Sequence, residues 1–201
     1  MTRHFVILGN AVNVAWSLYD AARKVSSFTN CFKDSKDLIM LWGFAERKDF
    51  ETINEGDRIL VYAQKSNTKI SRGGFIALGT VFKKLEDERT DIYWPYPHEG
   101  KKGKDEWPYR FYIKLNAILS DILNSLRSSL VTPPYVNRET SISELNNLIK
   151  PWILLPCSSF EGSLGKSLVE VEYPEIFNAL AEKIIEKARI IPLHHVFEVL
   201  W

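Results

Sequence analysis

The stretch from Asp57 to Lys84, DRILVYAQKSNTKISRGGFIALGTVFKK, decides the fold that the sequence predicts. Its two ends, Asp57–Ala63 and Phe75–Lys84, are apolar runs rich in β-branched and aromatic residues, which are typical of strands. Gly79 inside the second run indicates a β-bulge or a close approach of another backbone. The polar loop between the runs holds three cations, Lys65, Lys69 and Arg72. We therefore expect two strands joined by a cationic loop.

Other apolar runs predict further strands on both sides, at His4–Leu8, Asp37–Phe44, Pro108–Leu115 and Pro151–Leu155. Helical spacing and helix-start signals predict helices at Asn13–Lys24 with Asn13 as its cap, at Ile118–Leu130, from about Thr140 and at Pro174–Ala188. Residues 50–56 are expected to form a helical turn or a loop. The strands cluster between residues 4 and 115, which favours an α+β fold with a curved sheet or small β-barrel over alternating βαβ units.

Composition is that of an ordinary globular protein. The chain has 201 residues, 45% of them hydrophobic and 25% charged, with a formal net charge of +1. We expect one domain at residues 1–190, with a core at 4–115 and a C-terminal helical part at 116–190. Residues 191–201 are expected to be a tail or the start of a linker, since the chain stops on the apolar run Val196–Trp201 and is read as a fragment of a longer polypeptide. A near-neutral chain is not a strongly basic coat protein for DNA.

Cysteine usage predicts a reducing compartment. Cys31 and Cys157 are the only cysteines, and no secretory signal precedes them. No apolar run approaches about 18 residues, so we expect no membrane span and a cytoplasmic location. Glutamine occurs once, as Gln64, and cysteine and methionine twice each. This scarcity of labile residues is typical of a thermophile.

Catalytic motifs are weak. Residues 162–167 half-resemble a phosphate loop, but Phe160 stands where that motif requires glycine, and a flexible loop is the favoured interpretation. The histidines, His4, His98, His194 and His195, have no metal-ligand spacing. A solvated face is the favoured interpretation of the carboxylates Glu46, Asp49, Glu51 and Asp57. We predict no catalytic residue, metal or cofactor, with a Cys157 thiol enzyme as an alternative if the fold brings a histidine to it.

Residues 91–113 combine two Trp-Pro pairs with a Lys-rich loop. One interpretation is a hairpin whose aromatic residues fill a core, and the other is a surface where bases stack and lysines meet phosphates. We assign four of the aromatic residues to the wall of the sheet: Trp107, Tyr109, Phe111 and Tyr112. Trp94 lies in a Pro-flanked loop, and loops on rigid scaffolds carry function more often than strands do.

The order of several motifs resembles the PUA-like superfamily, in particular its EVE and YTH branches. The motifs are Phe5–Asn10 followed by Asn13, Trp42-Gly43, Glu55–Tyr62, Gly74–Val81, Tyr93–Pro95 and Trp107–Ile113. Together they cover roughly residues 4–115. The Lys-Ser pair of the YTH pattern is replaced by Leu8-Gly9, which leaves the base identity open.

The resemblance implies an aromatic cage. In YTH domains two tryptophans enclose a methylated adenine and asparagine side chains read its edge. Carried over, Trp42 and Trp94 would be the walls, with Tyr93 beside Trp94, and Asn10 and Asn13 the polar readers. Phosphate contacts would come from Lys65, Lys69, Arg72, Lys101, Lys102, Lys104 and Arg110.

A module of this length also resembles the N-terminal specificity domain of archaeal McrB-type restriction GTPases. The expected function is therefore non-catalytic recognition of a flipped base, N6-methyladenine in DNA, ahead of an AAA+ GTPase domain and a nuclease subunit that this chain lacks. The alternative is a PUA-like RNA-binding domain without preference for a modification.

Overall fold

The computed structural model describes residues 2–24, 38–64, 73–85, 107–122 and 166–188. Within these ranges six strands form one sheet in the order β2-β5-β4-β3-β1-β6. The strands are β1 (His4–Asn10), β2 (Ile39–Phe44), β3 (Arg58–Gln64), β4 (Gly74–Lys84), β5 (Tyr109–Ile118) and β6 (Leu168–Glu170). β1 and β3 run parallel, and the other neighbouring pairs are antiparallel.

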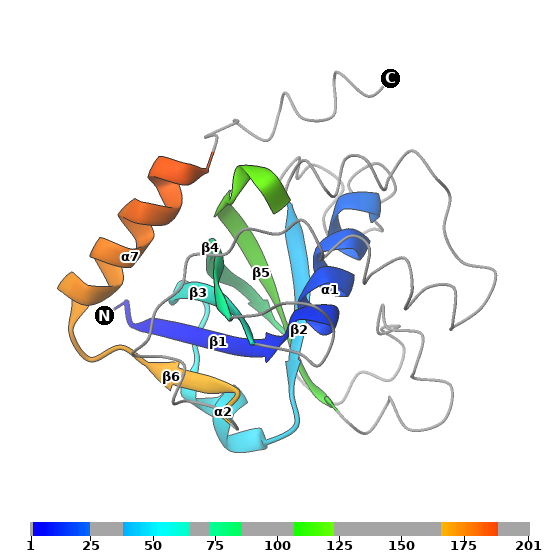
Figure 1. Cartoon of the computed structure of the whole chain (residues 1–201). Helices are drawn as coiled ribbons and strands as arrows, with labels where there is room; N and C mark the ends of the chain where they lie inside the picture. Colours follow the sequence, from blue (N-terminus) through cyan, green and yellow to red (C-terminus); the bar gives the residue numbers. More distant parts are fainter. Residues whose placement is uncertain (1, 25–37, 65–72, 86–106, 123–165, 189–201) are drawn as a thin grey trace.

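The sheet is curled, and helices lie around it (Figure 1). Helix α1 (Ala11–Lys24) follows β1 directly and packs on β1, β2 and β3. The short helix α2 (Arg47–Thr52) contacts β2 and β5, and α7 (Pro174–Lys187) packs on β4 and β5. This arrangement confirms the α+β curved sheet flanked by helices that the sequence predicts.

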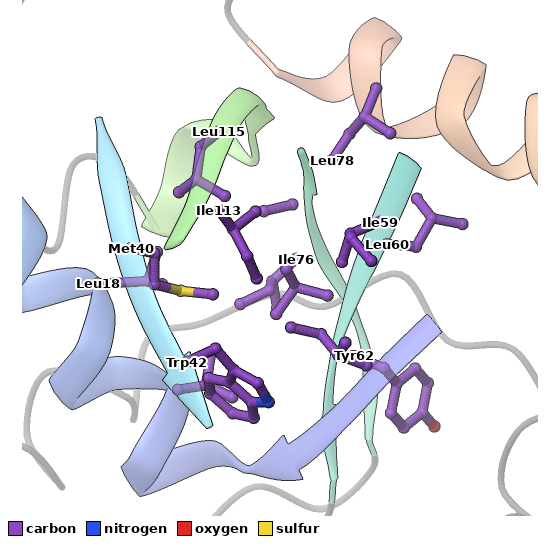
Figure 2. Packing of buried hydrophobic residues seen from close by; sticks show 14 of the residues in the cluster. Leu18, Met40, Trp42, Ile59, Leu60, Tyr62, Ile76, Leu78, Ile113 and Leu115 are labelled. Atoms are coloured by element: carbon purple, nitrogen blue, oxygen red, sulfur yellow. The ribbon is translucent and has the colours of Figure 1, made fainter. Parts of the chain in front are cut away.

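The core fills the inside of the curl. Met40 and Trp42 of β2 lie near Leu18 of α1 and Ile113 of β5, whereas Leu60 and Leu78 lie on the opposite side of the sheet, where α7 passes (Figure 2). The five consecutive residues from Ile59 to Ala63 are all buried. β3 is therefore covered on both faces, which explains why its sequence is continuously apolar rather than alternating in polarity.

Most strand predictions are confirmed within a few residues, two local predictions are corrected, and one strand was missed. Helix α1 begins at Ala11, so Asn13 lies inside its first turn and is not the cap. Helix α2 occupies residues 47–52, earlier than the expected turn at 50–56. Strand β6 was not predicted. The elements expected near Thr140 and at Pro151–Leu155 lie outside the described residues, as does most of the helix expected at Ile118–Leu130.

Gly79 lies at a β-bulge where another strand approaches closely, as its position inside a predicted strand indicated. The pairing of β4 with β5 shifts register between Leu78 and Gly79. A Cβ atom added at Gly79 would lie 2.6 Å from Cγ2 of Ile113 and 2.8 Å from the carbonyl oxygen of Lys114. The close approach of β5 at this bulge therefore requires glycine.

The prediction that the carboxylates form a solvated face is wrong for Asp57. Its side chain is buried and accepts hydrogen bonds from the backbone N–H groups of Arg3 at 2.9 Å and Asn54 at 2.8 Å. The guanidinium of Arg3 lies 3.7 Å from the same carboxylate. Asp57 thus ties the start of β1 to the turn before β3, and that turn places Gly56 at a φ of 90°. Gly56 and Asp57 therefore stabilise the fold at this turn.

His4 gives the fold a pH dependence. Its ring lies 4.6 Å from that of Phe177 on α7, and burial together with the charge of Arg58 lowers the pKa of His4 below 6.5, against an opposing effect of Asp57. The unfolded chain therefore binds a proton at His4 at a higher pH than the folded chain does, so stability falls as the pH drops through 6.5. We expect urea unfolding between pH 8 and 5 to show a shallower loss of stability in His4→Gln than in the wild type. Equal slopes in the two proteins would contradict this role for His4.

Candidate nucleic-acid interface

Two of the predicted base-binding residues, which are 32 positions apart in the sequence, converge at the end of β1. Asn10 is the last residue of this strand and is exposed. The preceding residue, Gly9, lies against the indole of Trp42: a Cβ atom added at Gly9 would lie 2.3 Å from Cη2 and 2.7 Å from Cζ2 of that ring. β1 and β2 are not neighbours in the sheet. The contact therefore closes the curl from β2 to β1, and only glycine leaves room for it.

Trp42 is packed rather than open. Only 6% of its surface is exposed, and the ring lies within the hydrophobic cluster beside α1 (Figure 2). A base needs a free aromatic face for stacking, so the groups that cover this indole would have to move first. Its expected partners Trp94 and Tyr93 lie outside the described residues, and the cage remains a prediction.

Asn10 and Trp42 flank the strand end from two sides. Successive residues of a strand point to opposite faces of the sheet. A side chain at Gly9 would point to the face of the sheet where the indole of Trp42 lies. The side chain of Asn10, the next residue, therefore points to the opposite face. Asn13 lies one turn into α1 and is partly buried. The polar readers and the tryptophan therefore surround the junction of β1 and α1, but they do not face one another across a cage.

The junction also favours anions. Backbone N–H groups in the first turn of a helix have no partner within the helix, and the helix dipole places partial positive charge there. Helix α1 has 14 residues and no acidic residue in its first turn. A phosphate near residues 11–14 would meet favourable electrostatics.

Arg110 was predicted to bind phosphate, and the structure does not support this role. The residue is buried on β5, and its Nε donates a hydrogen bond to the carbonyl oxygen of Trp107 at 3.1 Å. A guanidinium must reach solvent to meet a nucleic-acid backbone, so we remove Arg110 from the proposed contacts. The other six predicted phosphate ligands lie outside the described residues: Lys65, Lys69, Arg72, Lys101, Lys102 and Lys104.

Like Arg110, Lys84 directs its charged group to backbone carbonyl oxygens of the fold. Its Nζ donates to the carbonyl oxygens of Phe50 at 2.6 Å and Ile53 at 2.8 Å, and it lies 4.1 Å from the centre of the Phe50 ring. Burial lowers the pKa of Lys84, with nearby carboxylates, Glu51 first, opposing it. Lys84 therefore caps the end of α2 and fixes it to β4.

Features of an enzyme are sparse in the part of the chain that the structure describes. Ser167, the last residue of the half-matched phosphate loop, donates its hydroxyl to Asp49 of α2 and so serves to hold β6 in place. In the same ranges no three His, Cys, Asp or Glu side chains gather as a metal site, and no helix is long and apolar enough to cross a membrane. Cys157 lies outside them, as do His98, His194 and His195.

No protein-family model matches this sequence, and no curated protein matches it. Among solved structures, the chain is similar to a hypothetical protein from Leishmania major, at 14% identity and a TM-score of 0.43, over 91% of this chain and 97% of that one. It is also similar to human THYN1 protein in complex with 5-methylcytosine containing DNA, at 11% identity and a TM-score of 0.42, over 90% and 98% of the two chains.

The N-terminal domain of Thermococcus gammatolerans McrB bound to m5C DNA is similar at 18% identity and a TM-score of 0.34, over 74% of this chain and 98% of that one. A McrB-type domain, which the sequence resembles, is thus among the similar structures.

Proposed function

We propose that this chain is a non-catalytic nucleic-acid-binding module that reads a modified base at the junction of β1 and α1. The observation that carries the proposal is the convergence of Asn10 and Trp42 on the two sides of Gly9. Asn10 offers an amide that can pair with a base edge, and Trp42, on the other face of the strand end, offers an indole on which a base can stack once the groups that cover it have moved.

The energetics allow base reading at this place. Extruding a base from a duplex costs a few kcal/mol. Stacking on an aromatic side chain returns roughly 1–3 kcal/mol per base. Uncovering Trp42 adds to the cost, so recognition depends on the amide contacts and on phosphate contacts as well. The phosphate contacts are proposed for the lysines and Arg72 of residues 65–72 and 101–104.

The modified base proposed first is N6-methyladenine in DNA, as the resemblance to YTH domains implies. Two of the similar solved structures hold methylcytosine DNA, so 5-methylcytosine is the second base to test. We further propose that the module works in the cytoplasm as the specificity part of a McrB-like restriction system, ahead of a GTPase domain and a nuclease subunit.

A titration tests this function. Fluorescence anisotropy would follow the binding of one duplex sequence that carries N6-methyladenine, 5-methylcytosine or no modification, with single-stranded RNA as competitor. We expect one modified duplex to bind at least tenfold more tightly than the unmodified one, and RNA to compete poorly. Because the chain is nearly neutral, affinity should fall only modestly with salt. Equal affinity for all duplexes, or full displacement by RNA, would refute the proposal.

A further inference from the structure

Gln64 is the one glutamine of the chain and lies at a place that the predicted site did not include. It ends β3, and its register partner in the parallel strand β1 is Asn10. Paired residues of neighbouring parallel strands point to the same face of the sheet. The two carboxamides therefore stand side by side at the edge where both strands end.

The amide nitrogen of Gln64 has no hydrogen-bond partner although it is buried. Among the described residues, its Nε2 is the one buried side-chain nitrogen or oxygen atom without a partner. Buried donors are almost always satisfied, because a donor that is removed from water and left unpaired destabilises the fold. An aliphatic residue here would avoid this penalty. The penalty is consistent with a donor that is satisfied only when a ligand is present.

We infer that Gln64 is a base-reading residue that works beside Asn10 at the carboxyl ends of β1 and β3. The inference rests on the proposed function and adds a specificity-determining residue to it. A carboxamide carries an NH2 donor group and a carbonyl acceptor in one plane, and it pairs with a base edge that offers an acceptor next to a donor.

Both candidate bases offer such an edge once they leave the stack. N6-methyladenine keeps the N1 acceptor beside one N6–H donor, and 5-methylcytosine has the N3 acceptor beside its N4–H donors. Nε2 of Gln64 would donate to the ring nitrogen, and its Oε1 would accept from the exocyclic amine. Asn10, which is exposed, supplies a second carboxamide at the rim of the same site.

The variant Gln64→Leu tests the inference, because leucine is close in volume to glutamine and has no amide. We expect its Tm to be equal to or higher than that of the wild type, since the unpaired buried donor is gone. Its affinity for the preferred modified duplex should fall at least tenfold, because both hydrogen bonds of the carboxamide to the base edge are lost. Stability and binding then move in opposite directions, which a packing role does not produce.

Thr80→Val is the matched control. Thr80 lies on β4, next to β3, and its hydroxyl donates to Oδ1 of Asn116 at 3.0 Å, so this polar group already has a partner. The control should not raise Tm and should leave duplex binding unchanged.

Three results would overturn the inference. A wild-type chain that prefers a modified duplex while Gln64→Leu binds equally well would remove Gln64 from the site and leave the proposed function intact. A lower Tm in Gln64→Leu would show that the amide stabilises the fold. A wild-type chain without preference for either modified duplex would refute the proposed function and the role of Gln64 with it.

Discussion

Replacement of Asp57 by alanine should lower the free energy of unfolding by about 3 kcal/mol. The buried carboxylate accepts the backbone N–H groups of Arg3 and Asn54 and lies within ion-pair distance of the Arg3 guanidinium. Alanine leaves both N–H groups without acceptors inside the fold, where each unpaired donor is costly. The change should be measured by urea unfolding followed by circular dichroism.

Glu51→Ala is the control for this prediction. Glu51 pairs with Arg47 at 2.7 Å one helical turn away, but the two side chains are 61% and 72% exposed. An exposed pair of this kind contributes less than about 1 kcal/mol. If Asp57→Ala were no more destabilised than Glu51→Ala, the role of Asp57 as the anchor between β1 and the turn before β3 would be wrong.

Gly9→Ala should lower stability by about 1–3 kcal/mol and weaken binding to the preferred duplex about tenfold or more. The added methyl group would lie 2.3 Å from the nearest atom of the Trp42 ring, so the indole must move. The ring is packed in the core and cannot turn aside as a flexible surface side chain can. Thermal unfolding and the anisotropy titration measure the two effects.

Gly56→Ala separates the two effects. Gly56 has a φ of 90°, so alanine there is strained by about 1–3 kcal/mol, but an added Cβ atom would meet nothing within 4 Å. This variant should lose similar stability and retain its affinity for the duplex. Weakened binding in both variants would mean that binding follows stability and not the position of Trp42.

The extent of the sheet could be predicted from the sequence because each of its longer strands is an apolar run that ends at polar or turn residues. Strand β6 was missed because it has only three residues, none fully buried, and pairs with β1 alone at the edge of the sheet. Local patterning carries little information about so short a strand. The start of α1 was misplaced because the strand passes into the helix without a turn, so no loop residue marks the boundary.

The site was predictable only in part. Asn10 and Trp42 were found from the order of motifs, and the contact between their strands could not be derived from either motif alone. Arg110 was misassigned because a cation on a strand next to a predicted binding loop resembles a phosphate ligand, whereas burial decides its role. Gln64 was missed because it precedes a polar segment and belongs to no motif. Its only signal in the sequence was its place at the end of the strand, directly before three cations.

The most direct test of the account is the ratio of affinities for modified and unmodified duplexes in Trp42→Phe compared with the wild type. Phe44→Leu is the control, because Phe44 is buried in the same strand and stacks on Phe111 at 5.1 Å. We expect a ratio of at least ten in the wild type and in Phe44→Leu, and a ratio several-fold lower in Trp42→Phe. An unchanged ratio in Trp42→Phe, or a ratio of one in the wild type, would contradict the reading of a modified base beside this indole.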